Sequence, residues 1–468
     1  MPKESKATPQ RAVVAAVQLP SVSDADLEAS LDELRELAKT LGFAVVATFI
    51  QKRTSFDSAA YLGSGKREEI RLFVQGDAEP EQKGPERRIA HHGAVAAREA
   101  AKGLAGTDAR GAAFLLVDHE ISPSQARTLE KEVGCQVMDR TMVILEIFHR
   151  HARSKAARAQ VEIARLRYLA PRLREAAKLA GPQGRQRSGV GGRGAGEAAG
   201  ESDRAKIRDR IAELKQEIVA LDLERKTQRA RRQESQDLSR VALVGYTNAG
   251  KSTLMRALTG SEVLVADKLF ATLDTTVRTL VPEGVPRVLV SDTVGFIKNL
   301  PHDLVASFKS TLEEAAEASL LLHVIDASDP GFERQIEVTE KVLREIEAAK
   351  VPRLRVFNKI DRVGDAKAQA ARAKGLRLQF PKCIVVSAVD KEDVGRLHKA
   401  ISAFFARRLA KAELFLPWSA QQLRGEVFAV CEVLEERADT EGTFFSVRGE
   451  RKDIDALRER IGQAAGGP

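Results

Sequence analysis

A glycine-rich segment near the middle of the chain has the residue types and spacing of a phosphate-binding loop. It reads Gly245-Tyr-Thr-Asn-Ala-Gly-Lys251-Ser252, the pattern GxxxxGK[ST], between an apolar run and a helical pattern. Its backbone N–H groups can wrap phosphates, and the following helix N-terminus adds positive potential. We expect Lys251 to reach the β- and γ-phosphates and Ser252 to ligate Mg²⁺. The candidate contacts are Gly245, Tyr246, Thr247, Asn248, Ala249, Gly250, Lys251 and Ser252.

A second motif, Asp292-Thr-Val-Gly295, comes directly after the apolar run 288–291. We expect the Asp292 carboxylate to hold Mg²⁺ through water and the Gly295 N–H to contact the γ-phosphate. Ras-like proteins carry a glutamine after this glycine to orient the attacking water, but here the residue is Phe296. Hydrolysis without a partner is therefore expected to be slow. The candidate contacts are Asp292, Thr293, Val294 and Gly295.

Two later motifs predict the choice of base. Asn358-Lys-Ile-Asp361 and then Ser387-Ala388 each follow a strand-like run. The Asp361 carboxylate can accept hydrogen bonds from N1–H and the N2 amine of guanine, whereas adenine lacks that amine and would leave the carboxylate underpaired. Backbone groups at Ser387-Ala388 would reach the guanine oxygen. The candidate contacts are Asn358, Lys359, Ile360, Asp361, Ser387, Ala388 and Val389.

Between the loop and Asp292 lies a segment with the character of a GTPase switch, Phe270-Ala-Thr-Leu-Asp-Thr-Thr276. One threonine should bind Mg²⁺ when the γ-phosphate is present. Spacing alone leaves Thr272, Thr275 and Thr276 open. The candidate contacts of this segment are Phe270, Ala271, Thr272, Leu273 and Asp274.

The elements that must position these motifs fall into four predicted domains in a chain of 468 residues. Residues 1–148 alternate strand and helix patterns, such as strands 11–19 and 43–50 around a helix at 24–41, and predict an α/β domain with a parallel sheet. Residues 237–411 alternate apolar strands and helices in the doubly wound pattern of a P-loop GTPase domain. Residues 412–468 predict a small α+β domain with strands at 426–434 and 443–447 and a helix at 453–461.

The remaining residues, 149–236, predict an antiparallel helical hairpin. Apolar residues recur at helical spacing from Ile163 to Ala180 and again from Ile207 to Leu221, around a Gly/Arg-rich loop at 181–200. Twelve Lys/Arg and two acidic residues occupy 149–193, a local charge of +10 in a chain whose total is +9. This concentration indicates a polyanionic partner, either nucleic acid or an anionic surface. The arginines of the first helix that are expected to face outward are Arg153, Arg165, Arg167, Arg172 and Arg174.

Other features of the sequence exclude several classes of protein. No apolar run approaches the roughly 20 residues of a transmembrane helix. The three cysteines lie far apart with no CxxC pair, and the histidines show no metal-ligand spacing, so neither a disulfide framework nor a zinc site is expected. We expect a cytoplasmic, monomeric protein.

These motifs resemble the HflX family of translation-factor-class GTPases. The most specific are GYTNAGKSTL, FATLD, DTVGF, NKID and the glycine-rich segment 189–197, with 61–66 and 118–125 resembling N-terminal family segments. The resemblance implies that the switch threonine is Thr272, that the glycine-rich loop lies near the peptidyl-transferase centre, and that the protein binds the large ribosomal subunit and splits stalled ribosomes. The glycine-rich loop of this chain departs from the family pattern at Gly192, Ala195 and Ala198. Asn248 resembles the residue of potassium-stimulated GTPases of this class, so K⁺ is a candidate activator.

We therefore expect a Mg²⁺-dependent GTPase, converting GTP to GDP, that docks its basic hairpin (149–193) on ribosomal RNA of the large subunit. Lys251, Thr272 and Gly295 are the expected catalytic residues, and Ser252, Thr272 and Asp292 the expected metal site. One alternative is a GTPase acting on other RNA, in rRNA maturation or tRNA modification. Another is a non-catalytic GTP-sensing scaffold for protein or membrane partners.

Overall fold

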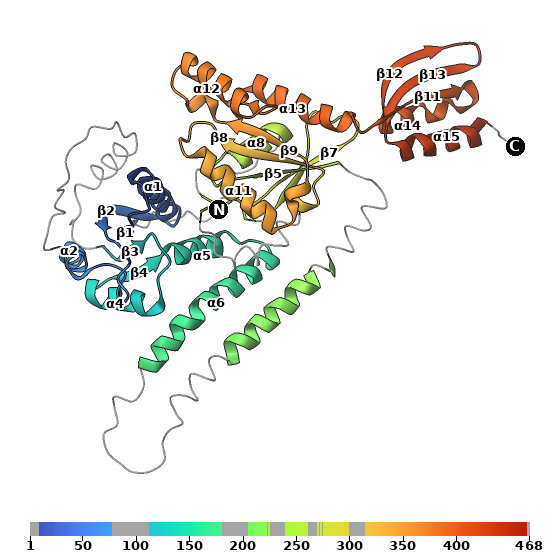
Figure 1. Ribbon diagram of the computed structural model, residues 1–468. Helices are drawn as coiled ribbons and strands as arrows, with labels where there is room; N and C mark the ends of the chain where they lie inside the picture. Colours follow the sequence, from blue (N-terminus) through green and yellow to red (C-terminus); the bar gives the residue numbers. More distant parts are fainter. Residues whose placement is uncertain are drawn as a thin grey trace. The chain divides into compact units, whose positions relative to one another are not determined.

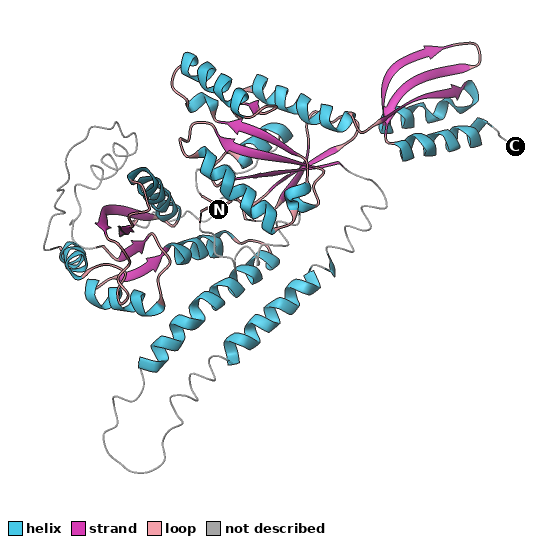
Figure 2. Ribbon diagram, viewed as in Figure 1, coloured by secondary structure: helices cyan, strands magenta, loops and turns pink. Residues whose placement is uncertain are grey.

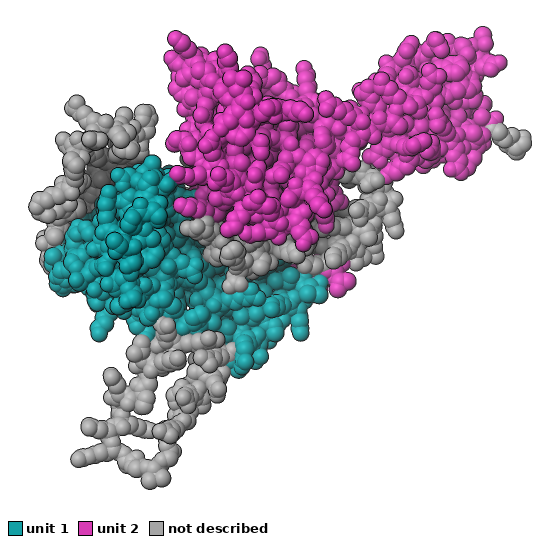
Figure 3. Space-filling view, in the orientation of Figure 1, with its two compact units in different colours: residues 1–219, 300–307 teal, residues 220–299, 308–468 magenta. Residues whose placement is uncertain are grey.

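The computed structural model describes residues 9–76, 112–179, 205–221, 223–224, 239–260, 269–270, 272–273, 275–298 and 314–465. These residues form two compact units, one up to residue 219 and one from residue 220 onward (Figure 3). The mixed α/β class predicted from the sequence is confirmed. No helix in these ranges is both long enough and apolar enough to cross a membrane.

The first unit contains a four-stranded parallel sheet in the order β2-β1-β3-β4 (Figure 1). Strands and helices alternate along the chain, as the sequence pattern predicted. The elements are β1 (Gln10–Gln18), α1 (Asp24–Thr40), β2 (Phe43–Lys52), α2 (Ser64–Gln75), β3 (Phe114–Val117), α4 (Pro123–Val133), β4 (Gln136–Asp139) and α5 (Arg140–His151).

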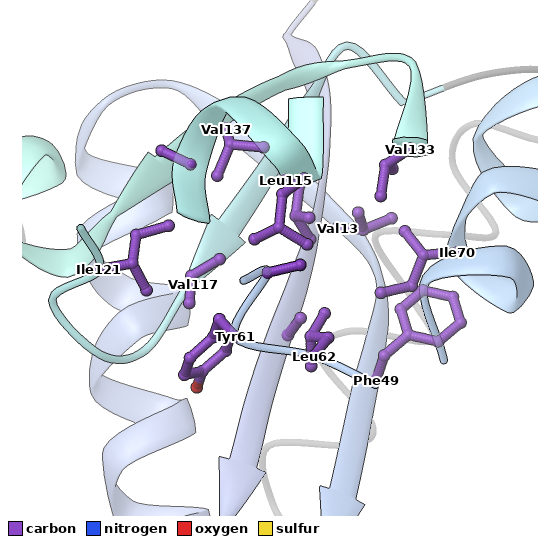
Figure 4. Packing of buried hydrophobic residues seen from close by; sticks show 14 of the residues in the cluster. Val13, Phe49, Tyr61, Leu62, Ile70, Leu115, Val117, Ile121, Val133 and Val137 are labelled. Carbon is purple, nitrogen blue, oxygen red and sulfur yellow. The ribbon is translucent and has the colours of Figure 1, made fainter. Parts of the chain in front are cut away.

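The inner strand β1 is buried along almost its whole length because a parallel sheet is covered on both faces. On one face, Val13 packs in a cluster with Leu115 of β3, Ile70 of α2 and Val133 of α4 (Figure 4). Serine side chains start two of the covering helices by accepting N-terminal backbone N–H groups, and the cap of α4 is a complete capping box.

The predicted helical hairpin belongs to the same unit. Helix α6 (Lys155–Leu179) packs against an antiparallel helix over residues 205–221 (Figure 1). Ile163 and Leu214 are buried at the centre of their contact, and Leu166, Ile211 and Ile218 pack around them. The helical seam predicted from the sequence is therefore confirmed for these residues, while the loop 181–200 lies outside the described residues.

The second unit contains the predicted doubly wound domain. Its six-stranded sheet has the order β10-β9-β8-β5-β7-β6, and only the pair β6–β7 is antiparallel. Figure 2 shows the strands of this unit in magenta and its helices in cyan. The carboxyl ends of β5, β7 and β9 therefore meet at one edge, where such folds bind ligands. The strands are β5 (Ser239–Gly245), β6 (Thr276–Thr279), β7 (Val288–Asp292), β8 (Leu320–Asp326), β9 (Arg353–Asn358) and β10 (Ile384–Val385). The helices are α8 (Lys251–Thr259), α11 (Phe332–Glu345), α12 (Ala366–Gln379) and α13 (Lys391–Ala406).

The C-terminal residues form a small α+β fold with the antiparallel sheet order β11-β13-β12. Its elements are β11 (Ala410–Pro417), η3 (Trp418–Leu423), α14 (Arg424–Val430), β12 (Cys431–Ala438), β13 (Gly442–Gly449) and α15 (Arg451–Ala465). Strand β11 was not predicted and spans the expected boundary at 411/412. Edge strand β12 carries a register shift between Val433 and Glu435.

The predicted strand at 426–434 is wrong over its first half. Residues 426–430 belong to helix α14, and the strand begins at Cys431. The β-branched composition favours a strand, but tertiary contacts override it. Val427 is buried in the C-terminal core, and the Phe428 ring packs edge-on against Phe445 at 5.9 Å.

Candidate nucleotide-binding site

The glycine-rich loop joins β5 to α8 at the carboxyl edge of the sheet (Figure 1). A Cβ atom on Gly245 would lie 2.1 Å from the Val324 carbonyl oxygen, and one on Gly250 would lie 2.2 Å from Asn358 Nδ2. Both glycines also have positive φ, at +148° and +92°. The loop backbone is thus held close to β8 and to the later Asn358 motif.

Lys251 is buried at the start of α8, where its Nζ donates to the carbonyl oxygens of Gly245 at 3.1 Å and Tyr246 at 2.8 Å. Burial lowers its pKa to about 8, although the nearby Asp292 carboxylate opposes that shift. The ammonium is therefore aimed into the loop by backbone acceptors, at the place where a phosphate would bind.

Three oxygen-bearing side chains converge beside this lysine. The Ser252 hydroxyl donates to Asp292 Oδ2 at 2.6 Å, the Thr272 hydroxyl donates to the same oxygen at 2.9 Å, and the two hydroxyls are 2.9 Å apart. Burial raises the pKa of Asp292, and its Oδ1 is buried without a hydrogen-bond partner among the described residues. Oxygen ligands with an unsatisfied buried carboxylate oxygen fit Mg²⁺.

The geometry separates the three switch threonines that spacing left open. Thr272 joins the oxygen cluster, whereas the Thr275 hydroxyl donates to Glu314 at 3.1 Å and Thr276 begins β6 opposite Asp292. Leu273 is buried, as is Phe270, which has a φ of +56°. The two other predicted contacts of this segment, Ala271 and Asp274, lie outside the described residues.

The second predicted motif lies against the loop. A Cβ atom on Gly295 would lie 3.0 Å from Lys251 Nζ and 2.9 Å from the Thr247 Cα. The backbone here lies so close to the loop that only glycine fits without a shift. Thr293 and Val294 are buried, and the Thr293 hydroxyl donates to the Leu243 carbonyl oxygen at 2.7 Å. The Thr293 hydroxyl therefore points at β5.

The Asn358 motif is joined to the loop and to the next strand. Asn358 Nδ2 donates to the Ala249 carbonyl oxygen at 2.9 Å, and its Oδ1 accepts from the Ala388 N–H at 3.0 Å. Asp361 is exposed, and its Oδ1 accepts from the Ser387 hydroxyl at 2.5 Å. These contacts place the Asp361 carboxylate beside residues 387–388, as expected for a base pocket. Val389 is 73% exposed and makes no such contact.

Sequence reasoning missed two features that support this site. Lys359, with a φ of +61°, forms an ion pair of 2.8 Å with Asp326 at the end of β8. The Tyr246 hydroxyl accepts a hydrogen bond from the Lys298 N–H at 2.8 Å. No spacing rule could have indicated either contact, because each joins segments that only the folded sheet brings together.

The hairpin departs from one prediction. Arg172 does not face outward: it pairs with Asp139 at 2.8 Å and lies over the Tyr168 ring at 4.5 Å. Arg165 is within 3.6 Å of Glu146. The helix α6 packs on the α/β domain, so part of its basic surface is used inside the protein. Arg185, Arg187 and Arg193 lie outside the described residues.

No cluster of three or more His, Cys, Asp or Glu side chains that could hold a metal ion occurs within the described ranges. The group formed by Ser252, Thr272 and Asp292 is of a different kind, because two of its three side chains are hydroxyls.

Three family models match most of the chain. Residues 28–80 and 91–149 match a GTP-binding GTPase N-terminal model, residues 151–232 a GTP-binding GTPase middle region, and residues 240–359 a model described as 50S ribosome-binding GTPase.

Curated relatives agree over nearly the full length. The GTPase HflX of Gluconacetobacter diazotrophicus is 51% identical over 98% of this chain and 99% of its own. That of Caldanaerobacter subterraneus is 38% identical over 94% and 91%, and that of Escherichia coli 40% identical over 72% and 77%. A crystal structure of a GTP-binding protein from Sulfolobus solfataricus with GDP covers 85% of this chain and 99% of its own, at 21% identity and a TM-score of 0.41.

Proposed function

The chain is a member of the HflX family of GTPases, and we propose that it binds the large ribosomal subunit and splits or rescues stalled ribosomes. The observation that supports this most directly is the match of residues 240–359 to the 50S ribosome-binding GTPase model, next to a match of the hairpin to the family's middle region. A cytoplasmic, monomeric protein fits this role. We keep the division into four domains as part of the proposal, at 148/149, 236/237 and 411/412, of which 148/149 falls inside α5 and 411/412 inside β11.

Within the site, we assign Lys251 to the β- and γ-phosphates and the Gly295 N–H to the γ-phosphate. Ser252 and Thr272 would ligate Mg²⁺, with Asp292 acting through water. When bound, this ion neutralises charge on the phosphate oxygens. Lys251, held by two loop carbonyl groups, adds a second positive charge at the same place. Asn248 is the candidate K⁺ ligand, and its backbone φ of +57° is uncommon for a residue other than glycine.

The base would be held at the other end of the loop. Asp361 is the acceptor for guanine N1–H and the N2 amine, and Asn358 ties the loop to residues 387–388. Lys359 is fixed by Asp326, and Ile360 begins the short turn that presents Asp361. The discrimination between guanine and adenine would come from leaving this carboxylate unpaired when the amine is absent.

GTP would favour ribosome binding by ordering both switches. Thr272 and Gly295 each lie against the loop, as a γ-phosphate and its metal ion would require. Hydrolysis removes the group that both contact, so the two segments would be released together. This gives the protein two states, one that binds the subunit and one that leaves it.

The hairpin would contact ribosomal RNA through cations that remain available on its surface. Lys155 on α6 and Arg208 and Lys215 on the opposite helix are exposed. Arg165 and Arg172 are poor tests of RNA binding because both have partners inside the protein. The Gly/Arg-rich loop at 181–200 would act within the ribosome, near the peptidyl-transferase centre.

Co-sedimentation with purified 30S, 50S and 70S particles tests this proposal in the presence of a GTP analogue, GDP or no nucleotide. We expect binding to 50S subunits that is strongest with the analogue, and conversion of 70S ribosomes to subunits. The logarithm of the binding constant should fall linearly with the logarithm of salt concentration, with a slope of roughly 0.7–0.9 for each neutralised phosphate. Equal binding in all three nucleotide states would contradict the proposal.

A charge-matched pair of variants tests the hairpin. Replacement of Lys155, Arg208 and Lys215 by alanine should weaken 50S binding and flatten the salt slope while GTP affinity is unchanged. The control removes the same charge from the exposed Lys367, Lys374 and Arg377 of α12. Deletion of residues 183–199 should keep docking and remove splitting. If the hairpin variant binds subunits like wild type, the hairpin is only a spacer.

The alternatives predict different outcomes. A GTPase acting on other RNA would bind free RNA as tightly as subunits. A non-catalytic scaffold is disfavoured because the relatives are GTPases and the loop, metal cluster and base motif are all present.

A further inference from the structure

The segment that carries Gly295 is fastened to the phosphate-binding loop at three points. The Phe296 N–H donates to the Gly245 carbonyl oxygen at 3.1 Å, and the Thr247 N–H donates to the Phe296 carbonyl oxygen at 2.7 Å. The third point is a side chain: the Tyr246 hydroxyl accepts from the Lys298 N–H at 2.8 Å. Residues 295–298 therefore run alongside 245–247 like one more short strand.

Tyr246 links the two functional halves of this arrangement. Its carbonyl oxygen accepts from Lys251 Nζ at 2.8 Å, while its hydroxyl holds Lys298. The residue is 9% exposed, and Phe296 and Ile297 on the opposite segment are each 1% exposed. The Tyr246 side chain has only two torsion angles and is buried, so it loses little conformational entropy when its hydroxyl accepts a hydrogen bond.

We infer that Tyr246 is a positioning residue for GTP hydrolysis, whose phenol oxygen holds residues 295–298 closed over the loop. The two backbone hydrogen bonds hold the segment at Phe296. The hydroxyl adds a second anchor two residues further on. With both in place, Gly295 stays beside Lys251, where its N–H can meet a γ-phosphate.

The contact should act only when GTP is bound. GDP has no γ-phosphate to hold Gly295, so the energy of the closed segment contributes to binding of GTP and not of GDP. Loss of the hydroxyl should therefore change the preference between the two nucleotides and the rate of hydrolysis, without changing how the loop holds the α- and β-phosphates. A role in packing alone would change neither quantity selectively.

The substitution Tyr246→Phe removes the acceptor and keeps the ring. In the full chain we expect affinity for a non-hydrolysable GTP analogue to fall about threefold to tenfold, the size of one buried hydrogen bond. GDP affinity should be unchanged, which also shows that the domain is folded. The kcat for GTP should fall and its KM should rise by about the factor lost in analogue affinity, because KM reports binding when hydrolysis is slow. The Lys298 amide should exchange faster with solvent in the analogue complex.

Tyr61→Phe is the matched control. The Tyr61 hydroxyl also accepts a backbone N–H, that of Val17 at 3.0 Å, but it lies in the α/β domain of the other unit. This variant should leave both nucleotide affinities and kcat as in wild type. An unchanged ratio of analogue to GDP affinity in Tyr246→Phe, together with unchanged kcat, would overturn the inference.

The inference rests on the γ-phosphate position proposed above, and Gly295→Ala separates the two. A Cβ atom there would come within 3.0 Å of Lys251 Nζ, so this variant should lose hydrolysis if the proposed site is right. Loss of activity in Gly295→Ala with normal Tyr246→Phe kinetics would reject only the role of the tyrosine. Normal activity in Gly295→Ala would reject the proposed site itself.

Discussion

The guanidinium of Arg172 on α6 donates a hydrogen bond of 2.8 Å to the Asp139 carboxylate, whose side chain is completely buried at the end of β4. The same carboxylate accepts the N–H groups of Met142 at 2.9 Å and Ile121 at 3.2 Å. One acid thus joins the sheet, the start of α5 and the hairpin. The hairpin is therefore rooted in the α/β domain and not merely tethered to it.

Arg172→Ala should destabilise this unit strongly, because it removes the cationic partner from a carboxylate that water cannot reach. We expect a loss of about 3 kcal/mol in the free energy of unfolding, measured with urea. Arg210→Ala is the control within the same hairpin. Arg210 pairs with Glu162 in solvent, with side chains 49% and 41% exposed, and its loss should change the free energy of unfolding very little. Equal midpoints for the two variants would show that Asp139 does not depend on Arg172.

Thr272→Ala should weaken binding of a GTP analogue in the presence of Mg²⁺ by about tenfold or more, because it removes one oxygen from the cluster with Ser252 and Asp292. GDP affinity should change much less. Thr275→Ala is the matched control, since that hydroxyl contacts Glu314 instead. Titrations with and without Mg²⁺ check the result. A larger effect from Thr275 would move the switch threonine to that position.

Asp361→Asn should weaken GTP binding by about a hundredfold or more and improve binding of xanthosine triphosphate. The amide offers a donor where xanthine carries a carbonyl group in place of the N2 amine of guanine. Competition between the two nucleotides on the same protein measures the exchange directly. If GTP binds the variant as before, Asp361 does not read the base.

Phe296→Gln should not create fast hydrolysis in this fold. The side chain is 1% exposed, so a glutamine placed there would be buried away from the attacking water. Burial of its amide should cost about 1–3 kcal/mol of stability. Phe296→Leu should keep the slow basal rate and cost less stability than the glutamine, because leucine leaves a small cavity but buries no polar group. Single-turnover assays without ribosomes, read beside urea unfolding, decide this; rapid turnover in the glutamine variant would show that the side chain reaches the nucleotide.

His323 should make stability depend on pH. It is 1% exposed in β8, and burial, with nearby positive charges, lowers its pKa to about 3 from an ordinary value of 6.5. Its contribution is complete above pH 6.5 and is lost as pH falls toward 3, because the unfolded chain then binds a proton that the folded chain excludes. Between pH 6.5 and 5 the loss should be about 2 kcal/mol. His323→Leu, compared with wild type in urea at each pH, should remove this component; parallel curves would contradict it.

The structure could be predicted from the sequence where a local motif determines the backbone conformation of its own residues. The glycines of the loop, the strand before Asp292 and the strand before Asn358 are local patterns, and the parallel sheet brings their ends together by topology alone. The hairpin seam could be predicted for the same reason, since helical periodicity identifies both faces. Confirmation of the α/β class followed from the regular alternation of strands and helices.

Other features depend on partners far away in the chain. Arg172 has the spacing of an outward-facing residue, but Asp139 lies 33 residues earlier and turns it inward. Residues 426–430 have strand-like composition, yet contacts with the C-terminal core fold them into α14. In each case a tertiary contact outweighed a local preference.

The register shift in β12 bears on how the protein behaves at high concentration. An exposed edge strand offers unpaired N–H and C=O groups to other chains and can nucleate aggregates. The shift between Val433 and Glu435 interrupts that row, and exposed charges at Glu432, Glu435 and Arg437 make docking of a second strand unfavourable. The β12 edge of the small C-terminal sheet is thereby a poor template for edge-to-edge pairing with a second chain.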